Sequence, residues 1–461
     1  MKIAITGATG LIGTKLAQSL FIEGHELILL ARKPSAAELA TGVPCQTASW
    51  STDLQNHALT EILRQCEAVV NLAGEPVSEG RWSREKKKRI YNSRINGTRQ
   101  LAQLIRELPS ASRPRIFISA SGIGIYGNRG DELLTEYSAI SSSPAHEDFL
   151  ADVCRDWEEA ALSPIDGVRS SSVRFGVVFA SSGGALEKIL PPFRAGLGGT
   201  IGNGHHWMSW IHVEDAVAAV LKVIKDPKLS GAINICSPEP ARNSEFTRVL
   251  ASSVRRPAIF PLPFPALKAL FGEKASILTA SQRVLPKKLL DNGFLFKHPS
   301  LFGALNDLVS AEVLDTFQWV PKKTNEVFDF FSDERNLERI TPPWLNFKVL
   351  GKSDPQIKAG TRIRYSLRLR HLPLKWDSVI DLWEPNQRFR DVQIRGPYQF
   401  WEHTHAFTPV KNGVHDGTWV QDRVRYRLPL GVLGEVVAAR VRKDLLHIFA
   451  YRKQVIRELL S

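Results

Sequence analysis

Three glycines near the start of the chain have the spacing of a phosphate-binding turn. Gly7, Gly10 and Gly13 follow an apolar segment at residues 1–5 and lead into a helical pattern. Gly7 would allow a tight turn, Gly10 would let backbone approach a pyrophosphate, and Gly13 would let helix and strand pack closely. The helix N-terminus would then offer N–H groups and a positive dipole end to phosphates. The pattern predicts a dinucleotide site, and a glycine-rich turn without a ligand is the alternative.

Two basic residues follow the second expected strand, at residues 26–30. This strand runs into Ala31, Arg32 and Lys33. In sites that select NAD, the end of the strand usually carries an acidic residue that binds the ribose 2′-hydroxyl. A guanidinium at that place would bind a 2′-phosphate instead. The sequence therefore favours NADP over NAD, with Arg32 and Lys33 at the phosphate. An exposed basic loop is the alternative.

Later strands bring small and hydroxyl-bearing residues to loops. The apolar segment at 68–72 ends in Ala73 and Gly74, and small residues at a strand end leave room for a nucleotide. The segment at 115–122 carries serines. A strongly basic helical stretch at 84–94 is interpreted as a solvated helix face. The alternation of strands and helices predicts an α/β fold with a doubly wound parallel sheet.

Taken together, these motifs resemble those of the extended short-chain dehydrogenases/reductases. They are Thr6–Gly13, Asn71–Gly74, Asn96–Thr98, Ser119–Ser121, Tyr126–Gly127, Arg174–Gly176 and Trp210–Asp215. The segments 183–186, 191–194 and 202–204 more narrowly resemble the epimerase-like branch, which is also labelled a cell-division-inhibitor homologue. A closing segment at about 245–298, including Arg283–Phe296, is typical of this branch. The resemblance covers about residues 1–300.

The resemblance implies a Rossmann-type domain that binds NADP and acts as an epimerase/dehydratase-like oxidoreductase. Its small-molecule substrate would be an alcohol or carbonyl, with a nucleotide sugar as one candidate. Ser121 would orient the substrate, or merely cap a turn, and Tyr126 would supply a phenol or shape the pocket. The implied cofactor-binding residues are Gly7, Thr9, Gly10, Leu11, Ile12, Gly13, Arg32, Lys33, Leu72, Ala73, Gly74, Asn96 and Ser119.

One departure from the family pattern concerns the acid/base pair. Active members carry Tyr-x-x-x-Lys on the helix after the serine strand, expected here at 147–162. That helix offers Phe149 with Val153, or Leu150 with Cys154. Glu147, Asp148 and Cys154 could titrate, but no spacing selects one of them. Two functions therefore stay open: an oxidoreductase, and a catalytically degenerate NADP-binding sensor or regulatory protein, with a link to cell division suggested by the family label.

After the α/β part the pattern changes to long strands and a final helix at about 433–460. Two short helices, an antiparallel meander and this long helix resemble the helix-grip fold of the START-like or polyketide-cyclase (SRPBCC) superfamily, over 311–461. The motifs that carry the resemblance are Glu326–Ser332, Asn336–Leu337, Pro342–Trp344 and Gly396–Tyr398. It implies an α+β domain whose cavity holds an apolar ligand. The superfamily includes carriers, enzymes and binding modules, so the fold does not choose a chemistry.

Several polar residues of this region and of the loops before it have more than one interpretation. His403 and His405 share a strand face with Trp401, but a metal needs further converging ligands and the sequence identifies none. No metal is predicted. The arginines of two strands are interpreted as the solvent-facing side of a sheet, with docking of an anionic partner as the alternative. They are Arg362, Arg364, Arg368, Arg370, Arg423, Arg425 and Arg427. Loop and helix-cap roles are preferred for His205, His206 and His212.

Composition, net charge and cysteine content limit the class of protein and its ligands. The chain has 461 residues, of which 43% are hydrophobic and 23% charged, as in soluble globular proteins. We expect an NAD(P)-binding domain at 1–300, a linker at 301–310 and a ligand-binding domain at 311–461. The net charge of +13 favours anionic ligands, but no nucleic-acid module is found. Four scattered cysteines fit a reducing cytoplasm. No leader or membrane-spanning segment is expected.

Overall fold

The computed structural model describes residues 1–51, 57–141, 148–369, 372–429 and 432–461. Glu147 and Arg370, both named above, lie outside these residues. The chain divides into two compact units, and the second consists mainly of Ala311–Ser461. Within the described part of the chain, no helix is both long enough and apolar enough to cross a bilayer.

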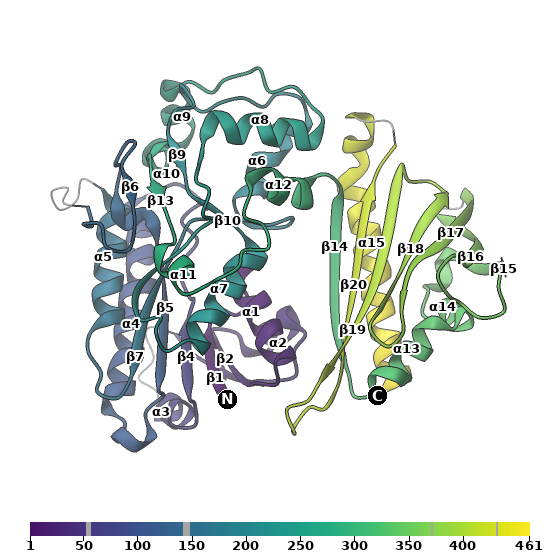
Figure 1. Cartoon of the computed structure of the whole chain (residues 1–461), viewed down its shortest axis with the longest axis horizontal. Helices are drawn as coiled ribbons and strands as arrows, with labels where there is room; N and C mark the ends of the chain where they lie inside the picture. The colour runs from purple at the N-terminus through teal and green to yellow at the C-terminus, as the bar shows by residue number, and fades with distance from the viewer. Residues whose placement is uncertain (52–56, 142–147, 370–371, 430–431) are drawn as a thin grey trace. The chain divides into compact units, whose positions relative to one another are not determined.

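The first unit is built on a seven-stranded sheet in the order β11-β7-β5-β4-β1-β2-β3 (Figure 1). Every strand pair in it is parallel. Its strands are β1 (Lys2–Thr6), β2 (Glu26–Ala31), β3 (Gln46–Ser49), β4 (Ala68–Asn71), β5 (Ile116–Gly122), β7 (Arg169–Phe175) and β11 (Gly231–Ile235). All residues of β4 are buried, as expected where helices cover both faces of a parallel sheet. The predicted doubly wound parallel sheet is confirmed.

Helices connect these strands. They are α1 (Leu11–Ile22), α2 (Pro34–Thr41), α3 (His57–Arg64), α4 (Arg84–Glu107), α5 (Phe149–Leu162), α6 (Gly184–Arg194) and α7 (Val213–Lys225). The long helices α4 and α5 lie side by side (Figure 1). Side chains that accept backbone N–H bonds fix where each begins: Ser83 at the start of α4 and Asp148 at the start of α5.

Residues 168–179 form two strands rather than one continuous strand. β7 ends at Phe175, and β8 (Val177–Phe179) leaves the main sheet to pair with β10 (Trp210–His212). The break falls at Gly176, where a Cβ would stand 2.7 Å from the Ser209 carbonyl oxygen.

The remaining short elements are β6 (Leu133–Leu134), β9 (Trp207–Met208), β12 (Ala241–Arg242), β13 (Arg283–Val284), α8 (Asn243–Val254), α9 (Phe264–Phe271), α10 (Ala275–Thr279), α11 (Lys287–Asp291) and η1–η3 (Ser110–Ser112, Ile123–Tyr126, Gly272–Lys274).

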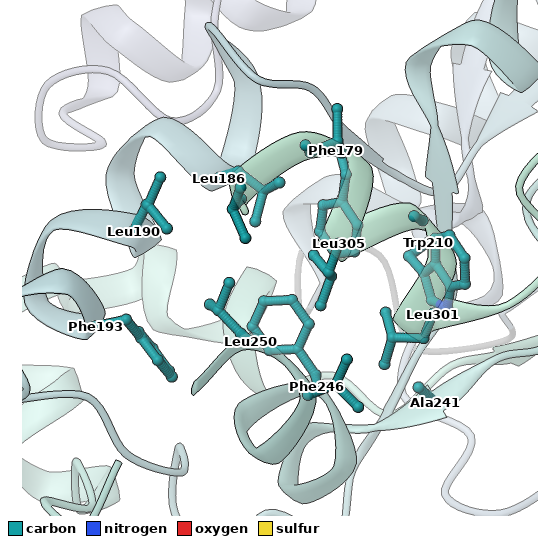
Figure 2. Packing of buried hydrophobic residues seen from close by; sticks show 14 of the residues in the cluster. Phe179, Leu186, Leu190, Phe193, Trp210, Ala241, Phe246, Leu250, Leu301 and Leu305 are labelled. Carbon is teal, nitrogen blue, oxygen red and sulfur yellow. The ribbon is translucent and has the colours of Figure 1, made fainter. Parts of the chain in front are cut away.

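The linker expected at 301–310 is instead a helix, α12 (Leu301–Val309), that packs into the first unit. Figure 2 shows Leu301 and Leu305 pointing into a cluster with Phe179, Trp210 and Phe246. Leu301, Ala304, Leu305 and Leu308 recur at helical spacing and are all buried. The prediction was wrong because the apolar surface that orders this segment comes from distant parts of the chain.

The second unit is a seven-stranded antiparallel sheet in the order β14-β20-β19-β18-β17-β16-β15. Its strands are β14 (Glu312–Val320), β15 (Lys348–Lys352), β16 (Arg362–Leu369), β17 (Leu372–Glu384), β18 (Arg388–Arg395), β19 (Phe400–Val410) and β20 (Gly417–Arg427). Its helices are α13 (Thr324–Ser332), α14 (Glu334–Arg339), η4 (Pro343–Leu345) and α15 (Val432–Leu460). The long helix α15 runs along the sheet (Figure 1). This architecture confirms the expected helix-grip domain.

Burial along the central strands alternates with a period of two. In β19, Trp401, His403, His405 and Phe407 are buried, while the residues between them are partly exposed. Arg362, Arg364 and Arg368 of β16 are exposed, as expected for the solvent side of a sheet. The buried face packs on α15 through residues such as Leu445 and Phe449.

Leu305 provides a test of the helix found in place of the linker. Its side chain has 0% exposure, so Leu305→Ala should remove buried apolar contacts and leave a cavity, at a cost of about 2–5 kcal/mol. Phe302 on the same helix is 59% exposed, and Phe302→Ala should change stability little. Denaturant unfolding of the three proteins compares these costs. Equal stability of Leu305→Ala and the unaltered chain would contradict the packing.

Candidate functional site

The turn after β1 has the geometry that its glycines predict. Gly7 has φ +70°, and a Cβ on it would stand 2.6 Å from the Leu72 carbonyl carbon. A Cβ on Gly13 would collide with the Gly7 carbonyl oxygen. The Gly10 N–H donates to that same oxygen at 3.0 Å, and α1 begins at the next residue. The turn therefore leaves the N-terminus of α1 accessible to an anionic group.

Buried hydrogen bonds tie together the strand ends beneath this turn. Thr6 Oγ1 donates to Asn71 Oδ1 at 2.6 Å and accepts the Ala73 N–H at 3.2 Å. Asn71 Nδ2 donates to Thr98 Oγ1 at 2.8 Å and to Ser119 Oγ at 3.3 Å. The network links β1, β4, β5 and α4. Ser119, predicted to bind the cofactor, is fully buried and is part of this support.

The predicted cofactor segments meet at one edge of the sheet. Residues 7–13, 32–33 and 72–74 follow the carboxyl ends of β1, β2 and β4, which are neighbouring strands. Thr9, Gly10 and Gly74 are exposed and Leu11, Ile12, Leu72 and Ala73 partly so. Arg32 and Lys33 are exposed directly after β2. In doubly wound sheets, ligands bind beyond these strand ends, where the strand order reverses.

Asn96 is not brought to this edge. It lies on the exposed side of α4, about 200° around the helix from Thr98, which is buried and bonded to Asn71. Thr98 also accepts a hydrogen bond from Trp157 Nε1 at 2.9 Å. Within the Asn96–Thr98 motif, Thr98 is therefore the residue that supports the site.

Ser121 and Tyr126 are buried and belong to an ionic network. Ser121 Oγ donates to Glu158 Oε1 at 2.9 Å. Arg174 binds both oxygens of Glu158 at 2.7 Å and donates to the Tyr126 hydroxyl at 2.7 Å. The Tyr126 hydroxyl donates to Asn234 Oδ1 at 2.9 Å and has 0% exposure.

The electrostatics of this network oppose acid/base chemistry. Burial raises the pKa of Tyr126 to about 12. Burial would lower the pKa of Arg174, but the hydrogen bonds and charge of Glu158 outweigh it and raise that pKa. A phenol that is enclosed in the protein and whose pKa lies well above 7 is a poor general base at neutral pH. Ser121 links β5 to Glu158 of α5, and Tyr126 on η2 links Arg174 of β7 to Asn234 of β11. Their catalytic roles stay predictions.

The face of α5 that would carry the usual catalytic pair is packed with apolar groups. Val153 is buried in a cluster, with Phe149 packed against it. In the other register, Leu150 and Cys154 lie against Gly124, whose Cβ would be 3.7 Å from each side chain. Burial raises the pKa of the Cys154 thiol to about 11. Neither register supplies a phenol or an ammonium, and Asp148 is occupied as the helix cap.

A half-buried cation that the sequence pattern did not single out lies beside Gly74. Arg94 Nη1 donates to the Glu75 carbonyl at 2.9 Å, and its guanidinium stacks 5.1 Å from the Trp157 ring centre. A Cβ on Gly74 would stand 3.0 Å from Arg94 Cζ. Burial lowers the pKa of Arg94, yet arginine remains charged in proteins. In the sequence, Arg94 lies four residues before Thr98, a spacing that places both side chains on one face of the helix. That spacing is the feature from which its position could have been predicted.

The basic stretch at 84–94 is therefore not uniformly solvated. Besides Arg94, the Lys86 side chain is buried, and its Nζ pairs with Glu75 Oε1 at 2.7 Å. The charge of Lys86 lowers the pKa of Glu75 through this hydrogen bond. Arg89, in the same stretch, is exposed as expected.

The second unit contains a cavity of about 210 Å³ between its sheet and α15. Most of its lining is apolar or aromatic, which fits the expected apolar ligand. The apolar lining includes Phe331, Leu337, Ile363, Trp376, Trp401, Leu445 and Phe449. Six acidic, basic or imidazole side chains also line it: Glu334, Asp391, His403, His405, Asp444 and Arg452.

Buried charges in this cavity perturb one another. Burial lowers the pKa of His405 to about 3 and raises the pKa of Asp391. Burial would raise the pKa of Asp422, but the Arg452 charge and the two imidazoles hold it well below its usual value. No third group near His403 and His405 is evident from the sequence, and the structure brings Asp391 to them from β18.

Family models match three parts of the chain. Residues 3–236 match the NAD dependent epimerase/dehydratase family, and residues 262–308 match a domain of unknown function, DUF1731. Residues 320–450 match the polyketide cyclase / dehydrase and lipid transport family. The second match extends into α12, which agrees with the packing of that helix on the first unit.

Curated relatives cover about two thirds of the chain. The chloroplastic SDR39U1 homologue of Arabidopsis thaliana, an epimerase family protein, is 38% identical over 309 residues, 67% of this chain and 87% of the relative. YfhF of Bacillus subtilis is 35% identical over 67% of this chain and 98% of its own length. Human SDR39U1 is 34% identical over 67% of this chain and all of its own length.

Solved structures agree with these relatives. The crystal structure of human SDR39U1 (isoform 2) with NADPH has a TM-score of 0.58 and 31% identity, covering 67% of this chain and 99% of that one. A nucleoside-diphosphate sugar epimerase from Corynebacterium glutamicum has a TM-score of 0.52 and 32% identity, covering 67% and 58%. With its glycine turn, its parallel sheet and these relatives, the chain belongs to the NAD-dependent epimerase/dehydratase family and carries a C-terminal polyketide-cyclase-type domain.

Proposed function

We propose that this chain is an NADP(H)-binding sensor or regulatory protein whose second domain holds an apolar ligand. The observation that carries the first part is the intact turn at Gly7–Gly13, together with Arg32 and Lys33 exposed beyond β2. The NADPH bound to human SDR39U1 supports the same cofactor. The apolar face of α5 supports a binding role, because the usual Tyr/Lys pair has no replacement there. The four free cysteines support action in the cytoplasm.

Cofactor preference is testable by calorimetric titration with NADPH and NADH. Because one charge-assisted phosphate contact is worth about 1.5–3 kcal/mol, NADPH should bind about ten- to a hundredfold more tightly. Arg32→Ala should remove most of this preference, and Lys33→Ala a smaller part. Arg64→Ala, at the distant end of α3, is the matched control. Equal affinities in the unaltered chain, or a preference untouched by Arg32→Ala, would contradict the proposal.

The half-buried guanidinium of Arg94 favours a second function, an oxidoreductase that reduces a carbonyl or oxidises an alcohol. A fixed cation beside the cofactor edge could stabilise the oxyanion that develops during hydride transfer. Nucleotide sugars are one candidate class, because the similar Corynebacterium glutamicum protein is described as a nucleoside-diphosphate sugar epimerase.

A turnover assay separates the two functions. For an oxidoreductase, a panel of carbonyls and nucleotide sugars should consume NADPH, and Arg94→Gln should lower kcat by about 10²–10³ while cofactor affinity is kept. Arg89→Gln, exposed on the same helix, should leave turnover unchanged. For a sensor, the unaltered chain should bind NADPH and turn over nothing in the panel. Robust turnover that Arg94→Gln does not affect would contradict both assignments.

Occupation of the cavity can be tested with an environment-sensitive apolar fluorophore. Val441 on α15 lines the cavity, so Val441→Trp should fill part of it and reduce the fluorescence gain. Val437, one turn earlier, is 49% exposed, and Val437→Trp should leave the gain intact. A folded chain that shows no gain, or equal gains in the two variants, would contradict an apolar ligand at this site.

A further inference from the structure

Three neighbouring strands of the second unit place carboxylates on either side of two histidines. In the register between β18 and β19, Asp391 stands opposite His403. In the register between β19 and β20, Asp422 stands opposite His405. His403 and His405 are two residues apart on one strand, so both imidazoles project from the same face of the sheet.

Each imidazole directs one nitrogen to Asp422 and the other toward Asp391. The Asp422 Oδ1 atom lies 3.2 Å from His403 Nε2 and 2.6 Å from His405 Nδ1. The Asp391 Oδ1 atom lies 3.6 Å from His403 Nδ1 and 4.0 Å from His405 Nε2. One ligand atom from each of Asp391, His403 and His405 falls within 4.8 Å of the others. An outer carboxylate that holds the far nitrogen of a ligating histidine is the usual second layer of a metal site.

We propose that Asp391, His403 and His405 bind a divalent first-row transition metal ion, with Asp422 orienting the two imidazoles. Two imidazole nitrogens and one carboxylate oxygen are ligands that Zn²⁺ and its neighbours accept. Metal–ligand bonds of about 2.0–2.2 Å in a tetrahedral site separate the ligands by about 3.3 Å. The contacts at 3.6 and 4.0 Å would need to close by only a fraction of an ångström.

The surrounding charges are consistent with a bound cation. The guanidinium of Arg452 is paired with Asp422, with Nη2 3.9 Å from Oδ1, and stacks over Phe331 and Phe449. Arg452 thus offsets the charge of Asp422, the outer carboxylate. The charge of Asp391, whose side chain is 17% exposed and lines the cavity, remains for the metal.

The three ligands leave part of the coordination sphere directed at the cavity. Because all three line it, positions not filled by the protein would meet the polar group of an apolar ligand. The contact between such a ligand and the metal rests on the proposed function of the second domain. A metal with open positions would polarise a carbonyl or hydroxyl oxygen as a Lewis acid.

A second cluster in the first unit serves as an internal control. His212, His298 and Asp307 also lie close together. Yet His212 Nδ1 accepts the Glu214 N–H at 3.1 Å and so caps α7, and His298 Nε2 lies 3.5 Å from Glu214 Oε2. These contacts assign the cluster to helix capping and ion pairing.

The test uses the full chain, stripped of metal with a chelator and then titrated with Co²⁺ while its visible absorption is recorded. One Co²⁺ per chain should bind with an intense tetrahedral-type spectrum, and Zn²⁺ should displace it. Asp391→Asn and His405→Gln should weaken binding at least about tenfold, and Asp422→Asn about 10–100-fold. His298→Gln and the exposed His447→Gln should bind as the unaltered chain does.

Folding is checked by circular dichroism and by melting, which Zn²⁺ should shift upward in the unaltered chain. If a cluster variant fails to fold, the Co²⁺ spectra of the unaltered chain and of His298→Gln still show whether the chain binds the metal and whether His298 is needed for it. Absence of Co²⁺ binding in the unaltered chain, unchanged binding in folded cluster variants, or loss in His298→Gln alone would overturn the proposal. Fluorophore binding by the same proteins reports separately on the apolar ligand, so metal binding without fluorophore binding would overturn only the latter.

Discussion

The backbone of the turn after β1 passes so close to the backbone after β4 that Gly7 has no room for a side chain. This contact, with the equally close approach of Gly13 to Gly7, sets where α1 starts and leaves its N-terminus open. The buried bonds among Thr6, Asn71 and Thr98 hold the strand ends in register beneath it. The proposed binding of NADP(H) depends on this arrangement, because it places the positive end of the α1 dipole at the carboxyl edge of the sheet.

A second constraint explains why the hydroxyls of Ser121 and Tyr126 are hydrogen-bonded inside the protein. A buried charge is tolerated only when it is paired and its remaining hydrogen bonds are satisfied. Glu158 and Arg174 meet that requirement by pairing with each other and by using the hydroxyls of Ser121 and Tyr126. Both hydroxyls are thus engaged within the protein. Arg94 lies beside Gly74, at the edge where the cofactor segments meet.

In the second unit, one cavity is lined both by apolar side chains and by ionisable residues. A small cavity lined by aromatic residues would suit a simple carrier. Two histidines between two carboxylates are costly to bury unless they are paired with one another. Because these residues line the same cavity as the aromatic side chains, a ligand held there would meet both kinds of group.

How much of this follows from the sequence depends on the range of each interaction. The glycine turn, the parallel and antiparallel sheets and the long final helix are recoverable from local spacing, because positive φ and residue periodicity are local requirements. The partial burial of Arg94 at the end of a basic helical stretch, and the packing of Leu305, depend on surfaces supplied by remote segments. The meeting of Asp391 with His403 depends on the register between β18 and β19, which spacing along the chain cannot reveal. Local geometry was thus determined by the sequence itself, while the side chains that share a site were decided by tertiary packing, because burial and charge pairing are set by whatever the fold brings alongside.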